Sequence, residues 1–283
     1  MTYTRTDPGR LFAALVCPVC GGDLALSGRS FLCPDRHTFD LARHGYLSLL
    51  SGRSAASADT AAMVQARTAF LDAGHYDHLA RALATAATSL CPTDGTVLDA
   101  GVGTGSYLAA VLDALPDAVG VGLDASKYAA RRAARAHPRG GAATWDLWRP
   151  LPVRTAAVDL VLNVFAPRNG AEFRRVLRPG GALLVVTPGP EHLAELRDRM
   201  GLLSVDAAKE ERLHRSLAEW FAAERSDSLD AALTLGADDV EHLVSMGPSA
   251  WHVGSEEVRR RTAELELPVR VTASFQLSVY RPR

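Results

Sequence analysis

Three cysteines and a histidine near the start of the chain have the types and spacing of a metal site. They form the pattern Cys17-x-x-Cys20 followed by Cys33-x-x-x-His37. Thiolate and imidazole ligands favour zinc, and a Cys3His set fills every corner of a tetrahedron. No corner is left for a catalytic water. The spacing therefore predicts a structural zinc ion that supplies folding energy to a stretch with little core of its own.

Nearby residues fit around this predicted zinc site. Gly21 and Gly22 follow the first pair and permit the positive φ angles that a metal-binding turn needs. A short hairpin over residues 23–32 is expected to join the two halves of the site. His44 is an alternative to His37, although its neighbours suit a helix or loop better. Cys91 lies outside the cluster and is expected to be an ordinary buried thiol.

A second group of residues suits the binding of a nucleoside cofactor. The apolar stretch TVLDA at 96–100 is followed by the glycine loop GVGTG at 101–105. Glycines there allow a sharp strand-to-helix turn and a close approach of the backbone to a ligand. The spacing is tighter than that of dinucleotide enzymes, and Asp99 would repel a pyrophosphate while attracting the ammonium group of a methionine moiety. Together these features favour S-adenosylmethionine over NAD.

Two more acids are expected beside the glycine loop. Asp124 ends the second strand, where a carboxylate accepts both hydrogen bonds of a ribose diol. Asp146 lies at the end of the third strand and can accept from the adenine amino group, with Leu147 flanking the ring. The predicted cofactor-binding residues are Asp99, Gly101, Gly103, Thr104, Gly105, Tyr107, Asp124, Asp146, Leu147 and Asn163.

The segment NVFAPRN at 163–169 follows the fourth strand, where the transferred methyl group would point. It is predicted to form the acceptor pocket, with Asn163, Phe165 and Pro167 as the catalytic group. Asn163 would orient either the methionine carboxylate or an acceptor amide. Phe165 would either stack on a base or pack in the core. The sequence names no proton acceptor, and His75 is only a weaker candidate for that role.

Alternating strand and helix patterns position these residues. The expected parallel strands are 96–100, 118–124, 142–146, 157–165 and 181–188. Helices are expected at 62–90 with a break near Gly74, and at 105–115, 126–137, 190–202, 207–223, 237–245 and 255–265. Strands near 228–235 and 270–280 would close the sheet as an antiparallel pair. This order predicts an α/β, Rossmann-like class I methyltransferase fold with a doubly wound, mostly parallel seven-stranded sheet.

The chain of 283 residues is expected to divide into three parts. These are a zinc-binding RNA-recognition module at 1–54, a helical linker region at 55–90 and the methyltransferase domain at 91–283. No apolar run is long enough for a membrane span and the start is unlike a signal peptide, so a cytoplasmic location is expected.

The net charge of −1, from 31 basic and 32 acidic residues, excludes binding of nucleic acid by bulk charge. Any nucleic-acid surface must therefore be local. Residues 126–139 contain Lys127 and four arginines without an acid, which fits a phosphate-binding helix or, equally, a solvated helix face.

Several motifs are shared with a known family: CPVC, CPDRHTFDLARHGYLSLL, DTAAMVQARTAFLDAGHYDHL, LDAGVGTGSYLA, RRAARAHPR, NVFAPRN, LRPGGALLVVTP, HLAEL and MGPSAWH. With them the sequence resembles the RlmA family of 23S rRNA guanine-N1-methyltransferases, in particular its actinomycete branch linked to macrolide resistance. The resemblance implies methyl transfer from S-adenosylmethionine to guanine N1 in a hairpin loop of 23S rRNA. It also implies a zinc module that holds RNA, and a homodimer with a wider cleft. By position, Cys17, Cys20, Cys33 and His37 match the zinc ligands, and Gly101, Gly103, Asp124 and Asn163 fall in the cofactor segments.

Two other functions remain open at this point. A small-molecule methyltransferase, such as one that tailors a natural product, would use the same scaffold and suits the balanced charge. A zinc-dependent RNA-binding protein without catalysis is disfavoured by the complete set of Asp99, Asp124 and Asp146. A dehydrogenase is disfavoured by the glycine spacing.

Overall fold

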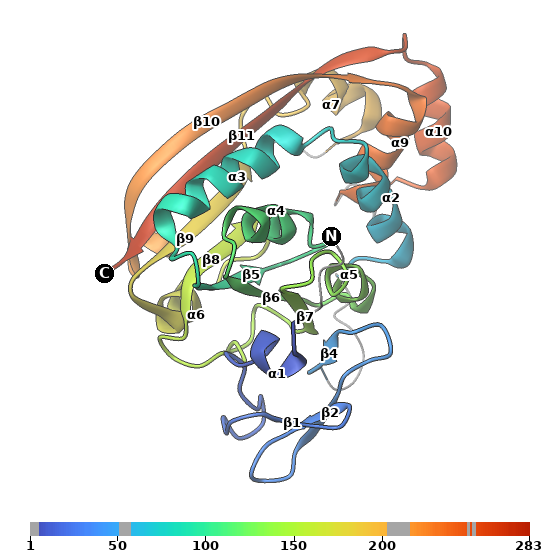
Figure 1. The fold of residues 1–283 in the computed structure, drawn as a ribbon. Coiled ribbons are helices and arrows are strands. Elements are labelled where there is room, and N and C mark those ends of the chain that lie inside the picture. The colour runs from blue at the N-terminus through green and yellow to red at the C-terminus, as the bar shows by residue number, and fades with distance from the viewer. Residues whose placement is uncertain (1–5, 51–57, 203–215, 248–249, 251–252) are drawn as a thin grey trace.

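The computed structural model describes residues 6–50, 58–202, 216–247, 250 and 253–283. In this part of the chain no helix is both long and apolar enough to cross a membrane. The described residues form two sheets, a small one near the N-terminus and a large central one (Figure 1).

The large sheet has eight strands in the order β10-β11-β9-β8-β5-β6-β7-β4. The strands from β4 to β9 pair in parallel, and β11 pairs antiparallel with both β9 and β10. This confirms the doubly wound, mostly parallel sheet of seven strands, to which the N-terminal module adds β4. The bounds are β4 (Leu47–Ser48), β5 (Thr96–Ala100), β6 (Val119–Asp124), β7 (Gly140–Thr144), β8 (Val158–Val164), β9 (Leu177–Pro188), β10 (Phe221–Leu235) and β11 (Val269–Pro282).

Helices cover both faces of this sheet because its central strands are apolar on both sides. In β5, successive side chains point to opposite faces, so that Val97 and Leu98 enter two different cores. Helices α3 and α4 cover one face, and α1 and α6 cover the other (Figure 1). The helices are α1 (Pro8–Leu11), α2 (Ala61–Asp72), α3 (Asp77–Leu90), α4 (Ser106–Ala114), α5 (Lys127–Ala133), α6 (Gly170–Val176), α7 (Ala194–Met200), α9 (Ala237–Met246) and α10 (Ser255–Ala263).

Some elements differ from the sequence-based expectation. Strand β7 ends at Thr144, two residues before Asp146, and α5 ends at Ala133 instead of continuing to His137. The predicted helix 207–223 is wrong at its end, since Phe221 already begins β10; its residues 207–215 lie outside the described part. The antiparallel register from Phe221 opposite Pro282 outweighs the helical propensity of the Ala-Ala-Glu that follows.

The N-terminal module shares its core with the large sheet. Its own sheet contains β1 (Ala25–Ser27), β2 (Ser30–Leu32) and β3 (Thr38–Asp40), and the β1–β2 pair confirms the expected hairpin. Leu15 bridges Val153 at the main chain, and the ring of Phe12 meets that of Phe31 edge-on at 5.5 Å. Strand β4 then pairs with β7. The predicted boundary at 54/55 lies outside the described residues, and the one at 90/91 falls at the end of α3.

Candidate functional site

The four predicted zinc ligands lie together in the N-terminal module. The ligand atoms of Cys17, Cys20, Cys33 and His37 are all within 4.8 Å of one another. Nδ1 of His37 lies 3.5 Å from Sγ of Cys17 and 3.3 Å from Sγ of Cys33, and Sγ of Cys20 lies 3.6 Å from Sγ of Cys33. These separations match the edges of a tetrahedron built from zinc–ligand bonds of about 2.0–2.3 Å. The donor set and its geometry therefore fit a structural zinc ion.

Two tight turns present these ligands. In the first, the amide of Gly21 donates to the carbonyl of Cys17 at 2.8 Å, and Gly21 has the expected positive φ, 73°. In the second, the amide of Arg36 donates to the carbonyl of Cys33 at 2.9 Å, and Arg36 takes a φ of 64° without the help of a glycine. His44 lies outside the cluster, and Cys91 is buried elsewhere, as expected.

The glycine loop turns sharply between β5 and α4. Gly101, Gly103 and Gly105 have φ angles of 95°, 52° and 82°, which side chains with a Cβ rarely adopt. A Cβ on Gly101 would also overlap the Cβ of Ala166, so this glycine lets the loop after β8 lie directly on the turn. The sharp strand-to-helix turn expected of these glycines is confirmed, and their close approach to a ligand stays a prediction.

Asp124 fixes the shape of the glycine loop. Its Oδ2 accepts from the amide of Gly103 at 2.9 Å, and its Oδ1 accepts from the amide of Ser126 at 2.8 Å. Each oxygen keeps a lone pair for a further donor such as a ribose hydroxyl. Burial, opposed by these two amides, leaves the pKa of Asp124 raised.

Asp99 is a buried carboxyl group with one oxygen atom that accepts no hydrogen bond from the described residues. It is only 2% exposed, and its Oδ1 has no hydrogen-bond partner in the described part of the chain. Burial, and then the nearby charge of Asp124, raises the pKa of Asp99 to about 8. An ammonium group would supply both the missing donor and the compensating charge. This pair of acids therefore fits the ribose and methionine ends of S-adenosylmethionine.

The other predicted cofactor residues surround the same turn. Asp146 accepts from the amide of Trp148 through Oδ1 at 3.0 Å, while Leu147 is buried and lies near Gly101. Thr104 is buried, with its hydroxyl 2.9 Å from that of Ser106. Tyr107 is partly buried against the core, and burial raises the pKa of its hydroxyl.

Asn163 organises the loop after β8. Its Nδ2 donates to the carbonyls of Ala100 and Pro167, both at 3.0 Å, while its Oδ1 is buried without a partner among the described residues. The side chain thus ties this loop to the end of β5. Phe165 follows with a φ of 52° and is 43% exposed, and Pro167 is also exposed.

Sequence reasoning missed two charged residues beside the glycine loop. Arg67 of α2 ion-pairs with Asp59 and donates to the carbonyl of Met246 at 2.7 Å. A Cβ on Gly103 would lie 3.5 Å from Nη1 of Arg67, so the guanidinium group covers this turn. Both residues belong to the DTAAMVQARTAFL stretch, but helical periodicity alone gives no sign that α2 reaches the loop.

A group of aromatic and imidazole rings beside Phe165 was also missed. The ring of Phe275 lies 5.5 Å from Phe165, 5.0 Å from Tyr76 and 4.9 Å from His192. Burial, and then Arg197, lowers the pKa of His192 to about 4, so its imidazole is neutral at physiological pH. His75 does not join this group at the site; its Nε2 lies 2.9 Å from Oδ1 of Asp239 on α9.

Comparisons with known proteins match both parts of the chain. Residues 15–55 match the zinc-ribbon family described as RlmA, N-terminal, and residues 97–181 match a family described as a methyltransferase domain. A Streptomyces fradiae protein named 23S rRNA (guanine(748)-N(1))-methyltransferase is 49% identical, over 95% of this chain and 96% of its own length. A Micromonospora griseorubida protein assigned as a 23S rRNA (guanine-N(1)-)-methyltransferase is 52% identical, over 96% and 98%. A similarly assigned Bacillus subtilis protein is 33% identical, over 87% and 90%.

The sheet order, the glycine loop and the acids beside it define an S-adenosylmethionine-dependent class I methyltransferase with a zinc ribbon. Within that class, the identity over nearly the whole length places the chain with particular relatives. The chain belongs to the family of 23S rRNA (guanine-N1)-methyltransferases.

Proposed function

We propose that this protein transfers a methyl group from S-adenosylmethionine to N1 of a guanine in 23S rRNA, and that the target is the guanine at position 748. The observation that carries the proposal is similarity over 95% of the chain to the Streptomyces fradiae enzyme whose name gives that position. The similarity spans the zinc module and the methyltransferase domain together, so it includes the parts expected to hold RNA as well as those that hold the cofactor.

The cofactor's role is to present an electrophilic methyl group on its sulfonium. Asp99 would bind the ammonium group and Asp124 the ribose diol, because both carboxyl groups lie beside the glycine loop. Asp146 would accept from the adenine amino group, with Leu147 against the ring. Since a sulfonium is already a good leaving group, the protein contributes mainly by positioning the two reactants.

The loop after β8 would position the guanine. Phe165 is an exposed aromatic ring held at a positive φ, a conformation that persists where the surroundings enforce it and that is typical of functional loops. Its ring can stack on an unpaired base, as aromatic side chains of RNA-binding proteins do. Asn163 acts through its hydrogen bond to the carbonyl of Pro167, and is therefore a positioning residue.

The test is methyl transfer from labelled S-adenosylmethionine to 23S rRNA that lacks its guanine-N1 methylation, followed by nucleoside analysis. We expect labelled 1-methylguanosine at position 748, lost in Asp124→Ala and retained in Asp227→Ala, an exposed acid of β10. Absence of label in rRNA, from protein that still binds zinc and the cofactor, would overturn the proposal. A small-molecule acceptor would then be the next candidate.

We also propose that this methylation confers macrolide resistance and takes place in the cytoplasm, where the ribosome lies. Expression in a susceptible host without the modification should raise the inhibitory concentration of a macrolide, and Asp124→Ala should not. An unchanged inhibitory concentration, with the nucleotide methylated, would separate modification from resistance. The homodimer stays a prediction, and light scattering with and without RNA tests it.

A further inference from the structure

Several basic side chains on one side of the molecule have no acidic partner. In the described part of the chain, Arg29, Arg43, Arg131 and Arg135 form no ion pair, whereas Arg132 on the same helix as Arg131 pairs with Asp72. Other arginines of the described residues also lack an ion pair, but these four are gathered at one place: Arg29, Arg43 and Arg135 line one pocket, and Arg131 acts on the same His44 as Arg43 and Arg135. Such a local cluster of positive charge is what an anionic partner requires.

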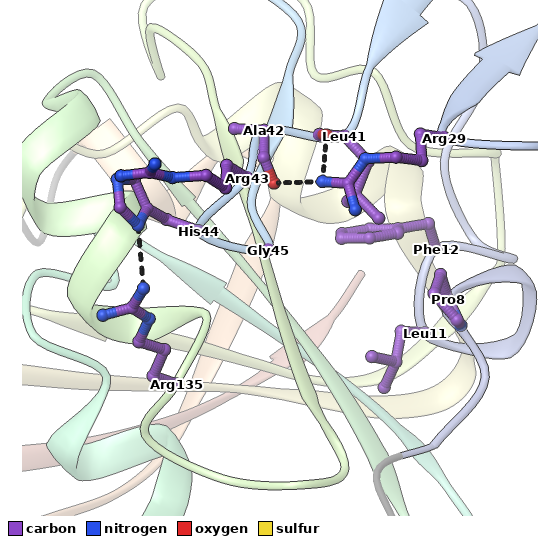
Figure 2. Close-up of a pocket in the computed structure, with 10 residues that line it drawn as sticks. All are labelled: Pro8, Leu11, Phe12, Arg29, Leu41, Ala42, Arg43, His44, Gly45 and Arg135. Carbon is purple, nitrogen blue, oxygen red and sulfur yellow. Dashed lines mark hydrogen bonds between the residues drawn. The ribbon is translucent and has the colours of Figure 1, made fainter.

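Three of them meet at a pocket between the N-terminal module and the turn that follows α5 (Figure 2). The pocket has a volume of about 300 Å³ and is open on one side. Arg29, Arg43, His44 and Arg135 line it, together with Leu11 and Phe12, and no acid is among its lining residues. This is a small basic pocket with an apolar wall, at the lower end of the sizes found for ligand sites.

Hydrogen bonds hold two of the guanidinium groups in place. Nη2 of Arg135 donates to Nδ1 of His44 at 2.8 Å, so one bond crosses from the turn after α5 to the N-terminal module. Nη2 of Arg29 lies 3.3 Å from the carbonyl oxygens of both Leu41 and Ala42 (Figure 2). Fixed donors lose less conformational entropy when a ligand binds.

The state of His44 reflects the positive field of this pocket. Partial burial, and then the charges of Arg131, Arg135 and Arg43, lower the pKa of its imidazole. Because a guanidinium group can only donate, Nδ1 of His44 accepts in its 2.8 Å contact with Arg135 and carries no proton. An anion placed among these groups would offset the same charges that act on His44.

We propose that this pocket binds one phosphodiester group of the RNA substrate, gripped between the N-terminal module and the turn after α5. The inference rests on the proposed function and adds to it a particular binding site. Guanidinium groups suit the task because their planar, paired donors match two oxygens of a phosphate. Leu11 and Phe12 supply an apolar wall for the attached ribose.

The path of the RNA from this pocket follows α5. Lys127 and Arg131 lie four residues apart on α5, about 6 Å along the helix axis, and Arg135 follows in the next turn; all three are exposed. Lys127 lies three residues after Asp124, at the cofactor edge of the sheet, while Arg135 lies in the turn beyond the other end of the helix. One strand can thus reach from the pocket to the cofactor crevice.

The experiment compares Arg43→Gln/Arg135→Gln with wild type in binding a hairpin RNA that contains position 748, by fluorescence anisotropy over a range of salt concentrations. We expect Kd to rise about tenfold and the slope of log K against log salt to fall by about 1. In methyl transfer the KM for RNA should rise to a similar extent, with kcat changed less than about twofold because the reacting atoms are untouched.

The matched control is Arg259→Gln, which removes an exposed arginine from α10 at the opposite end of the molecule (Figure 1). Zinc content and thermal unfolding establish that each variant is folded. A double variant with the same Kd and salt slope as Arg259→Gln overturns the proposal. A double variant that lowers kcat and leaves the KM for RNA unchanged also overturns it.

A second measurement separates one site from a diffuse field. Neutral methylphosphonate linkages are placed one at a time along the RNA. We expect one neutral linkage to raise the Kd of the wild type about as much as the double substitution does. In the double variant the same linkage should leave the Kd unchanged. Equal small losses at every linkage would overturn the single site.

Failure of the function and failure of the pocket give different results. A wild-type protein that binds the hairpin but methylates none of it refutes the proposed function. A wild-type protein that methylates it, with a double variant that binds equally well, refutes the pocket alone.

Discussion

Binding of the cofactor's methionine end should depend on pH through Asp99. Without a ligand this carboxyl group is buried beside Asp124, and its pKa is raised to about 8. The ammonium group of the ligand interacts favourably only with the ionised form. Below pH 8, binding must therefore release a proton from Asp99, and affinity must rise with pH.

The size of the effect follows from the fraction of Asp99 that is ionised. With a pKa of about 8, roughly a hundredth of the protein carries the carboxylate at pH 6 and roughly a tenth at pH 7. Affinity should then increase about ninefold between these two pH values, and level off near pH 8 as the ligand's own amino group begins to deprotonate.

Titration calorimetry with S-adenosylhomocysteine measures this directly, since that product keeps the ammonium group and undergoes no reaction. At pH 6.5, heats in two buffers of different ionisation enthalpy should report release of about one proton. Asp99→Asn should bind more weakly at pH 7.5 and lose both the proton release and the pH dependence. Asp146→Asn is the matched control: it weakens the adenine end and should keep the slope.

A cofactor affinity that does not change between pH 6 and 7 in the wild type, with no proton released, would refute the reasoning.

Asp99 should also make the stability of the ligand-free protein depend on pH, in the opposite direction to its effect on cofactor affinity. Because the pKa of Asp99 is raised on folding, its contribution to the free energy of unfolding is present below about pH 4 and is lost as pH rises through about 8. The ligand-free protein should therefore gain more thermal stability from ligand at pH 8 than at pH 6.

Three further substitutions test other parts of the site. In Cys17→Ser, metal analysis should find well below one zinc ion per chain. The N-terminal module should lose native structure, because the metal supplies folding energy there. Full zinc retention would contradict this. Gly101→Ala should lower the free energy of unfolding by about 2 kcal/mol or more in chemical denaturation, since the new Cβ is strained at positive φ and overlaps Ala166. A decrease under about 0.5 kcal/mol would show that the loop after β8 can move aside. Asn163→Ala should lower kcat by roughly tenfold to a hundredfold, because it frees the carbonyl of Pro167 and the loop that carries Phe165. The Kd for S-adenosylhomocysteine should be nearly unchanged. An equal loss of cofactor affinity would show that Asn163 binds the cofactor instead.

The sequence predicts the elements whose patterns are local. Two spaced pairs of ligands suffice to predict the zinc site. The acids near the ends of β5 and β6, with the glycines after β5, suffice to predict the cofactor edge, because parallel strands bring their carboxyl ends together. The break at Gly74 was predictable for the same reason: a glycine with φ of 83° separates α2 from α3.

Contacts between distant segments were not predictable in this way. Nothing local in α2 indicates that Arg67 reaches Gly103, or that Phe275 of β11 lies beside Phe165. The start of β10 at Phe221 was missed for a similar reason, because its extended form depends on a partner strand some 60 residues later, in register with Pro282. Asn163 has a role that only the folded loop reveals.

The pairing of β4 with β7 has a consequence for solubility. Without β4, the amides and carbonyls of β7, a strand of small residues with the sequence GGAAT, would lie at an open sheet margin able to pair with another chain. The two residues of β4 belong to the module whose Cys3His cluster is expected to need bound zinc to fold. Zinc starvation should therefore make the protein aggregate through its methyltransferase sheet, far from the metal itself, and a truncated chain that begins after the module should be prone to the same self-association.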